Sequence, residues 1–353
     1  MTSRERIRLT LHRHEPDRVA MAEIAFWPET VTRWQQEGLP ADQTPADYFG
    51  LDQLALGGCD CSLQLPVELL EETAEWKLER DADGTVHKVW KEHYAPPSEI
   101  DHLIKTRADW KRYRERLTPS DDRLAGTLAS YYQNAEENGQ FSTFNPTEPV
   151  WWTLRTLGME RALMTLAEDP KWFEEMVATQ AEMSLELIRK LLARGAKPDA
   201  VWFFSDLCYR NGMLFSPRAY RQIMMPYHKR YAELCHENDM FLILHCDGDV
   251  GEFIPLLIEP GVDCVQPLEA RAGNDVRDLK PLYGQQISFF GNINMDVLAT
   301  GDREAIKHEV VTKVQAAKVG GGYIYHSDHS VPPTVSFEAY SYAIELAREA
   351  GRY

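Results

Sequence analysis

The segment Phe241–Val250, which reads FLILHCDGDV, decides the fold expected for this chain. Its apolar start lies between two stretches with helical spacing, which is typical of a buried parallel strand. The strand runs into His245, Cys246 and Asp247, followed by a glycine that permits a tight turn and an aspartate that can cap the next helix. Either these are turn residues beside a core histidine, or they are a functional cluster at a strand end.

The same alternation of strand and helix recurs through the second half of the chain. Besides the strand within 241–250, strands are expected at 200–205, 263–266, 286–290 and 322–325, each with a helical stretch after it. Most of these strands end in polar residues, and the full set of polar strand-end residues is Asp206, His245, Asp247, Glu269, Asn292, Asn294, His326, Asp328 and His329. This recurrence favours the functional interpretation, because the carboxyl ends of parallel strands carry the active sites of barrels.

The first half adds three strand candidates, at 19–26, 48–58 and 141–145. Together the candidates give the strand count of a (β/α)8 TIM barrel, and the whole chain 1–353 is expected to form one such α/β domain. The competing fold is a doubly wound open sheet, but no glycine-rich phosphate-binding sequence follows the first strand. Residues 65–94 break the rhythm with a hairpin around an Asp-Gly turn, and are expected to project as an insertion.

Composition excludes several classes of function. The net charge of −17 opposes binding to a nucleic-acid backbone or an anionic membrane surface. The charged N-terminus does not resemble a signal peptide, and no apolar run is long enough for a membrane span. Six scattered cysteines do not form a disulfide framework, and the isolated Cys59-Asp60-Cys61 pair is interpreted as structural. A cytoplasmic protein is expected, and a homodimer is left open.

Histidine and carboxylate side chains from different strands suit a divalent metal such as zinc, with one position open for substrate. The expected ligands are His245, His329 and either Asp247 or Cys246, and Glu269 is a reserve ligand or base. The alternative for His329 is a hydrogen-bonded loop histidine.

Other polar residues near the strand ends are candidates for substrate chemistry. Asp206 is expected to bind substrate or to orient a histidine, and Tyr209 to donate a proton, although a capped surface loop explains this segment equally simply. Glu148 is a further candidate for orienting the substrate or supplying a proton. The remaining substrate-binding candidates are Trp151, Asn292, Asn294 and His326.

Spaced segments of the chain resemble the uroporphyrinogen decarboxylase superfamily. They are EPDRV near the start, SDLCYRNGMLFSPRAYRQIMMPYHKR, LHCDGDV, GVDCVQPLEARAGNDVRDLKPLYG, SFFGNINMDVLATGD and GGGYIYHSDHSVPPTVS. The resemblance implies a (β/α)8 barrel, in agreement with the strand count.

The resemblance also separates two chemistries. True decarboxylases carry an arginine-rich stretch near the N-terminus that holds the acidic tetrapyrrole, and the corresponding AEIAFWPETVTRW has no such arginine pair. The chain therefore looks closer to the corrinoid-linked methyltransferases, some of which bind zinc through His-x-Cys and a distant cysteine. Here His245 matches the histidine, while Asp247 and His329 fall on the cysteine positions.

An N/O-rich ligand set is a harder Lewis acid than a thiolate-rich one and suits an oxygen leaving group. The expected activity is methyl transfer from a small donor, such as an aryl methyl ether, to a corrinoid carried by a partner protein, with zinc or another divalent metal. Two rivals stay open. One is a metal-free decarboxylase or lyase of a porphyrinogen-like or smaller carboxylic acid, and the other is a non-catalytic barrel that binds a small ligand.

Overall fold

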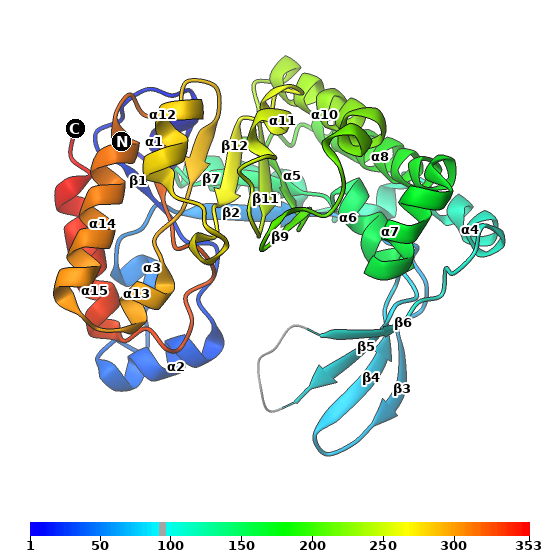
Figure 1. The fold of residues 1–353 in the computed structure, drawn as a ribbon, viewed down its shortest axis with the longest axis horizontal. Helices are drawn as coiled ribbons and strands as arrows, with labels where there is room; N and C mark the ends of the chain where they lie inside the picture. Colours follow the sequence, from blue (N-terminus) through cyan, green and yellow to red (C-terminus); the bar gives the residue numbers. More distant parts are fainter. Residues whose placement is uncertain (92–96) are drawn as a thin grey trace.

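The computed structural model describes residues 1–91 and 97–353 and contains the expected barrel (Figure 1). Its main sheet has eight parallel strands in the order β1-β14-β13-β12-β11-β8-β7-β2. Their bounds are β1 Ala20–Met21, β2 Leu54–Gly58, β7 Phe141–Asn145, β8 Ala200–Phe204, β11 Phe241–Cys246, β12 Cys264–Pro267, β13 Ser288–Phe290 and β14 Tyr323–Tyr325. The predicted α/β barrel class is confirmed.

The two end strands of the sheet, β1 and β2, approach each other through Asp52. The backbone N–H of Asp52 donates to Met21 O at 2.6 Å, and Met21 N–H donates back to Asp52 Oδ2 at 2.8 Å. Arg18 pairs with the same carboxylate at 3.0 Å, so this buried charge is compensated. The backbone and the side chain of this one residue thus join β1 to the segment before β2 where the barrel closes.

Alternate residues of the strands fill the barrel interior. Trp202, Ile243, Phe290 and Ile324 are fully buried there, as the two-residue period of a strand requires. Helix α1 (Ser3–Leu11) packs against this inner cluster through Ile7 and Leu11. The interior is therefore a packed core, and the polar strand ends stand at the opposite, carboxyl-terminal rim.

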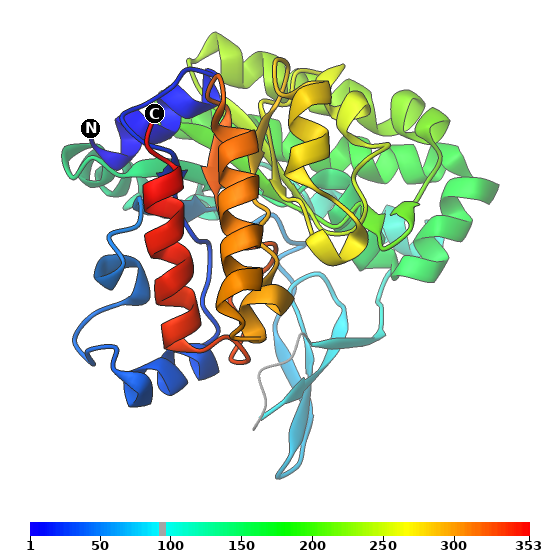
Figure 2. The same ribbon diagram turned by 60° about the vertical axis from the view of Figure 1, so that its left-hand side comes forward.

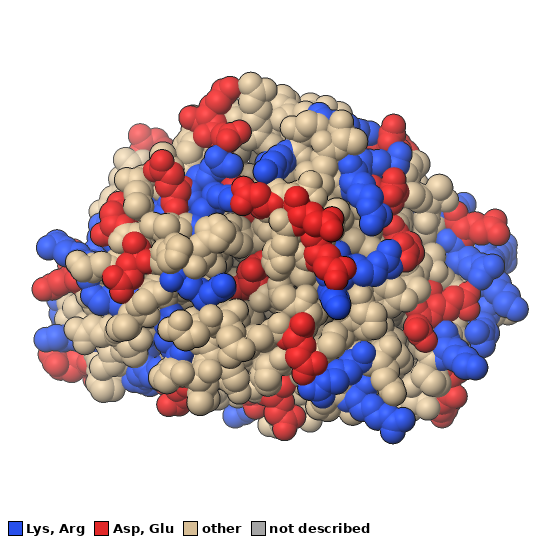
Figure 3. All heavy atoms as spheres, turned by 90° about the horizontal axis from the view of Figure 1, so that it is seen from above, with Lys and Arg blue, Asp and Glu red and all other residues tan. Residues whose placement is uncertain are grey.

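Helices lie around the sheet, some on its strands and some on other helices. They are α2 Pro28–Glu37, α3 Pro45–Tyr48, α4 Arg107–Tyr113, α5 Leu128–Glu137, α6 Pro149–Leu157, α7 Met159–Glu168, α8 Pro170–Ala193, α10 Met225–Glu237, α11 Ile254–Ile258, α12 Val276–Tyr283, α13 Met295–Ala299, α14 Arg303–Lys318 and α15 Phe337–Ala350. Figure 2 shows α14 and α15 side by side, and both chain ends at the same side of the barrel. Among the described residues no helix has the length and apolar character of a membrane span. On the face shown in Figure 3, acidic and basic side chains are interspersed.

The insertion is larger than the predicted hairpin at 65–94. It is an antiparallel sheet of four strands, β3 Glu68–Glu72, β4 Trp76–Arg80, β5 Val86–Trp90 and β6 Ser98–Asp101, which projects from the body of the molecule in Figures 1 and 2. The predicted hairpin forms its centre, and residues 92–94 of that prediction lie outside the described residues. The two outer strands are exposed at every position, so they lack the alternation that reveals a half-buried strand.

Two stretches of the chain with helical spacing are divided in the structure. The stretch 121–137 begins with a 3-10 turn at Asp121–Arg123 and becomes α-helical only in α5, beyond Gly126. The stretch 217–238 contains a π-helical turn at Tyr220–Met224 before α10. Pro226 lies in the first turn of α10 and has no N–H to donate, which accounts for the local change of hydrogen bonding.

Candidate metal centre at the barrel mouth

The ends of two neighbouring strands bring Asp206, His245 and Asp247 together. One ligand atom from each side chain lies within 4.8 Å of the others. His245 Nε2 is 3.6 Å from Asp206 Oδ1 and 3.8 Å from Asp247 Oδ2. Strands β8 and β11 are paired in parallel, so Asp206, two residues after β8, meets the end of β11. The sequence predicts that Asp206 binds substrate or orients a histidine, and in the structure its carboxylate lies beside His245 among the possible ligand atoms.

The second nitrogen of His245 fixes the tautomer of the ring. Nδ1 is 2.6 Å from the side-chain oxygen of Gln266, which is paired in register with His245 on β12. An amide oxygen only accepts, so Nδ1 carries the hydrogen and Nε2 is directed to the two carboxylates. Gln266 was missed by the sequence analysis. The one feature of the sequence that could have indicated a role for Gln266 is a polar residue within a buried strand. Its contact with His245 depends on the register between β11 and β12, which the sequence does not show.

The charges in this cluster are not balanced by its own side chains. Burial by itself would lower the pKa of His245, but Asp206 and Asp247 outweigh that effect and raise it above its ordinary value of 6.5. Burial raises the pKa of Asp247, and the Asp206 carboxylate adds to the increase, while His245 opposes it. Asp247 Oδ1 is buried and has no hydrogen-bond partner in the part of the chain that the structure describes.

These features fit a divalent cation. A neutral imidazole with its distal N–H held by an acceptor, together with two carboxylates from neighbouring strands, is a common donor set for zinc and similar metals. The unpartnered Asp247 oxygen would gain the partner that it lacks. All three side chains are partly exposed, so an exchangeable position toward solvent is available.

His329 and Glu269 stand beside this cluster. His329 Nε2 is 3.9 Å from Asp247 Oδ2, and its side chain is about half exposed. Glu269 Oε2 accepts from the backbone N–H of Gly248 at 2.8 Å, which joins the β12 and β11 ends. Both residues line a cavity of about 340 Å³ whose apolar wall consists of Trp27, Met295 and Pro332.

Cys246 lies on the other face of β11. Its side chain is fully buried in the layer between sheet and helices, and its thiol contacts Asp247 O. Successive side chains of a strand point to opposite faces, so a mouth that holds His245 and Asp247 turns Cys246 away. The structure thus places Asp247, and not Cys246, beside His245.

Gly248 permits the tight turn that its position after the strand suggested. Its φ is +91°, and an added Cβ would lie 2.6 Å from the backbone nitrogen of Tyr209. This close approach brings the short hairpin of β9 (Cys208–Tyr209) and β10 (Gly212–Met213) against the end of β11. The Tyr209 side chain is 48% exposed at the same rim.

Glu148 does not face the mouth. Its side chain is fully buried, with Oε2 accepting from Trp151 N–H at 2.6 Å as the cap of α6 and Oε1 lying 3.0 Å from His228 Nε2. His228 Nδ1 in turn lies 2.8 Å from Tyr220 OH. Trp151 packs partly buried against the main core cluster. The expectation that Glu148 orients the substrate or supplies a proton is therefore corrected to a buried helix-capping position against His228.

The side chains of three further substrate-binding candidates form hydrogen bonds with backbone groups. Asn292 is fully buried and donates to Leu268 O and Asn274 O at 3.1 and 2.8 Å. Asn294 caps α13. His326 is buried, donates through Nδ1 to Ser327 O and accepts through Nε2 from Ile24 N–H at 3.2 Å. Their hydrogen-bonding capacity is largely taken by the loops that frame the mouth, and Asn294 alone also lines a rim hollow.

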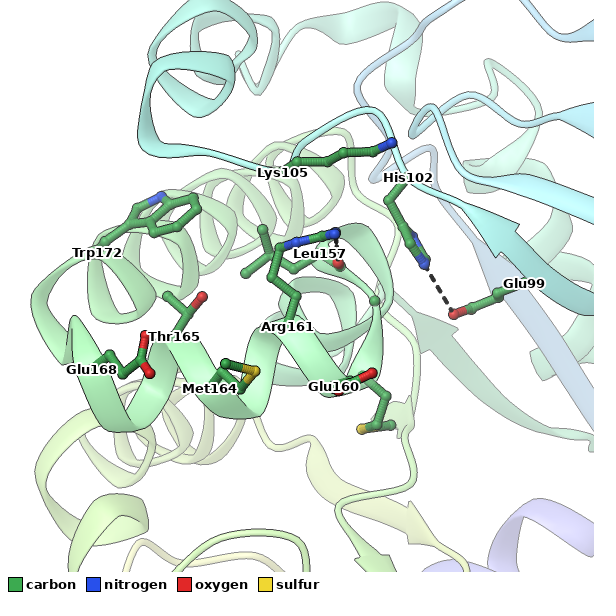
Figure 4. Close-up of a pocket in the computed structure, with 12 residues that line it drawn as sticks. Glu99, His102, Lys105, Leu157, Glu160, Arg161, Met164, Thr165, Glu168 and Trp172 are labelled. Atoms are coloured by element: carbon green, nitrogen blue, oxygen red, sulfur yellow. Dashed lines mark hydrogen bonds and ion pairs between the residues drawn. The ribbon is translucent and has the colours of Figure 1, made fainter.

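A second hollow, of about 730 Å³, lies away from this centre (Figure 4). It is formed by the segment after β6 and by α7, with Arg161 and His102 among its lining residues. None of the three clustered ligands contributes to it. The clustered polar side chains of the strand ends therefore lie at the barrel mouth and not in this hollow.

Comparison with known proteins agrees with this architecture. The sequence profile described as uroporphyrinogen decarboxylase (URO-D) matches residues 153–350, more than half of the chain. A solved structure of a methyltransferase from Methanosarcina mazei is similar, with a TM-score of 0.68 at 15% identity, covering 99% of this chain and 98% of that chain. None of the curated proteins matches the chain.

Proposed function

We propose that this chain, which belongs to the uroporphyrinogen decarboxylase family, is a methyltransferase that takes a methyl group from a small methylated donor and uses a divalent metal such as zinc. The observation that carries the proposal is His245 Nε2, which faces two carboxylates while Gln266 holds the opposite nitrogen. The similar fold of a methyltransferase from Methanosarcina mazei supports the choice among the chemistries of the family.

The three side chains Asp206, His245 and Asp247 would hold the metal, and His329 is the further nitrogen closest to Asp247. When bound, the ion would supply a Lewis acid for the oxygen of an ether donor, such as an aryl methyl ether. Ligand oxygens and nitrogens make that acid hard, which favours an oxygen leaving group over a thiol. Gln266 keeps the proton of His245 on Nδ1, so that Nε2 presents a lone pair.

The cavity next to the ligands would bind the donor. Trp27, Met295 and Pro332 offer an apolar wall for a ring, and Glu269 stands at its polar end. Tyr209, exposed at the same rim, is the residue we assign to protonating the departing oxygen. The methyl acceptor is proposed to be a corrinoid on a partner protein that approaches the mouth.

Two measurements test this function. Metal content is measured on protein purified without chelator, for the wild type, for His245→Ala, and for Cys246→Ser as the matched control one residue away. Methyl transfer is then followed with an aryl methyl ether and a corrinoid protein. We expect metal and activity in the wild type and in the Cys246 variant and neither in the His245 variant. A wild-type protein that never contains metal would refute the proposal.

A second function is favoured by one observation. The Asp206 carboxylate helps to raise the pKa of His245 above its ordinary value, which favours the protonated ring that a carboxy-lyase without metal would use as a proton donor. Arg210 and Arg271 line a hollow at the rim and offer cations to an acidic substrate, although Arg271 is paired with Asp296. Release of carbon dioxide from a small carboxylic acid by metal-free protein would decide for this alternative.

A further inference from the structure

Glu23 is a buried acid that the proposed chemistry does not use. It follows β1 by two residues, and its side chain has no exposed surface. Burial raises its pKa to about 8. Within residues 1–91 and 97–353 it forms no ion pair with a lysine or arginine, and its basic neighbour there is His326, with Nε2 at 3.3 Å from Oε2. A buried carboxyl without a cation costs stability, so its contribution must lie in its hydrogen bonds.

His326 does not supply a positive charge. Its Nδ1 donates to Ser327 O, and its Nε2 accepts from Ile24 N–H at 3.2 Å. Burial lowers its pKa to about 3, so the ring is neutral. Glu23 therefore has no cationic partner among the described residues, while the nearby Asp328 carboxylate adds to the rise of its pKa.

The hydrogen bonds of Glu23 lead to the loop after β14. Oε1 accepts from Ser327 N–H at 3.1 Å and from Tyr340 OH at 3.0 Å. Oε2 lies 2.6 Å from Ser327 Oγ, and the same hydroxyl contacts His329 O. A serine hydroxyl has one hydrogen to donate. If the Glu23 carboxyl donates to Ser327 Oγ, that hydrogen is available for His329 O, and the bonds form a continuous chain.

His329 needs such an anchor, because its side chain is about half exposed and packing alone does not fix it. The neighbouring Asp328 accepts from Ala270 and Met295 N–H at 3.2 and 3.0 Å, which holds one side of the loop. Ser327 and Glu23 hold the other side. Displacing the His329 backbone would change the approach of its Nε2 to Asp247.

We propose that Glu23 is a positioning residue, which through Ser327 fixes the backbone of His329 and thereby the place of its imidazole at the barrel mouth. The inference rests on the proposed function only where it treats His329 as part of the metal site. The position of the ring itself can be measured in metal-free protein.

The experiment compares four variants. Glu23→Ala removes the whole chain of bonds, and Ser327→Ala removes only the bridging hydroxyl. Glu23→Gln is the conservative rescue, because its amide oxygen accepts and its NH2 group donates to Ser327 Oγ. Tyr340→Phe is the matched control, which removes another donor to Glu23 and leaves Ser327 in place. The first readout is the ring Cε1–H resonance of His329 in metal-free protein, assigned with His329→Ala, and the second is affinity for Co²⁺.

We expect the His329 resonance to shift in Glu23→Ala and Ser327→Ala and to keep its wild-type position in Glu23→Gln and Tyr340→Phe. Co²⁺ affinity should fall about tenfold or more in the first two, and a double variant that combines Glu23→Ala with Ser327→Ala should bind no more weakly than the weaker of the two. An unchanged His329 resonance in both Glu23→Ala and Ser327→Ala, or additive losses in the double variant, overturns the inference. If Glu23→Ala does not fold, Ser327→Ala decides. A wild type that binds no Co²⁺ refutes the proposed function, while the resonance still tests Glu23.

Discussion

Replacing Glu23 with glutamine is expected to remove a pH dependence from the folding stability of this protein. The carboxyl is fully buried, and burial raises its pKa from the ordinary 4.5 to about 8. Between these two pH values the folded protein keeps the proton of Glu23, whereas the unfolded chain releases it. The unfolded state therefore binds fewer protons, and its free energy falls relative to the folded state as the pH rises.

The magnitude follows from the difference of about 3.5 pH units between the two pKa values. Each unit corresponds to about 1.4 kcal/mol, so the total is about 5 kcal/mol. The stabilising contribution of the proton is complete below the unfolded pKa of 4.5 and is lost as the pH rises to about 8. Glutamine resembles the protonated carboxyl at all pH values and has no such dependence.

The assay is equilibrium urea unfolding of wild type and Glu23→Gln at several pH values from about 5 to 8, where reversible refolding is checked at each. The difference in unfolding free energy between the two proteins should change by about 1.4 kcal/mol per pH unit, with the wild type losing stability toward high pH. Asp328, whose pKa is also raised by burial, is present in both proteins, and its charge acts on Glu23 and is part of the shift that the difference measures. Parallel curves across this range would refute a buried, protonated Glu23.

Three further predictions concern the metal centre. His245→Ala should lose bound metal with little change in thermal stability, while Cys246→Ser should keep its metal. Elemental analysis and melting curves measure the two properties, and a full metal content in His245→Ala would contradict the prediction. Gln266→Ala should weaken metal affinity about 10- to 100-fold, because the ring of His245 loses the acceptor that fixes its tautomer. Competition with a chromophoric chelator measures the affinity, and a wild-type value in the variant would contradict the role of Gln266 as that acceptor. Since the pKa of His245 is raised above 6.5, the metal must displace its proton, and on acidification the metal affinity should begin to fall at a higher pH than for an ordinary histidine. Calorimetry in buffers of different ionisation enthalpy should detect the released proton. An absence of proton release near neutral pH would contradict the raised pKa.

The sequence by itself determined the layout of the barrel and the position of its mouth. Apolar runs such as Phe241–Leu244 and the helices between them have local periods, so each could be recognised within its own segment. His245 and Asp247 share a face because side chains of a strand alternate, and the same rule turns Cys246 away from them. The outer strands of the insertion were missed because they are exposed at every position and have no such period.

Only the tertiary structure decided which polar residues belong to the site. Gln266 reaches His245 through the register of two strands, and Glu23 reaches Ser327 across the 304 residues that separate them in the chain. Glu148 follows a strand end as Asp206 does, yet its carboxylate is buried as a helix cap. The end of a strand fixes the position of the backbone, but the direction of a side chain depends on which hydrogen-bond donors surround it. Those donors come from distant segments, which no local pattern of residues encodes.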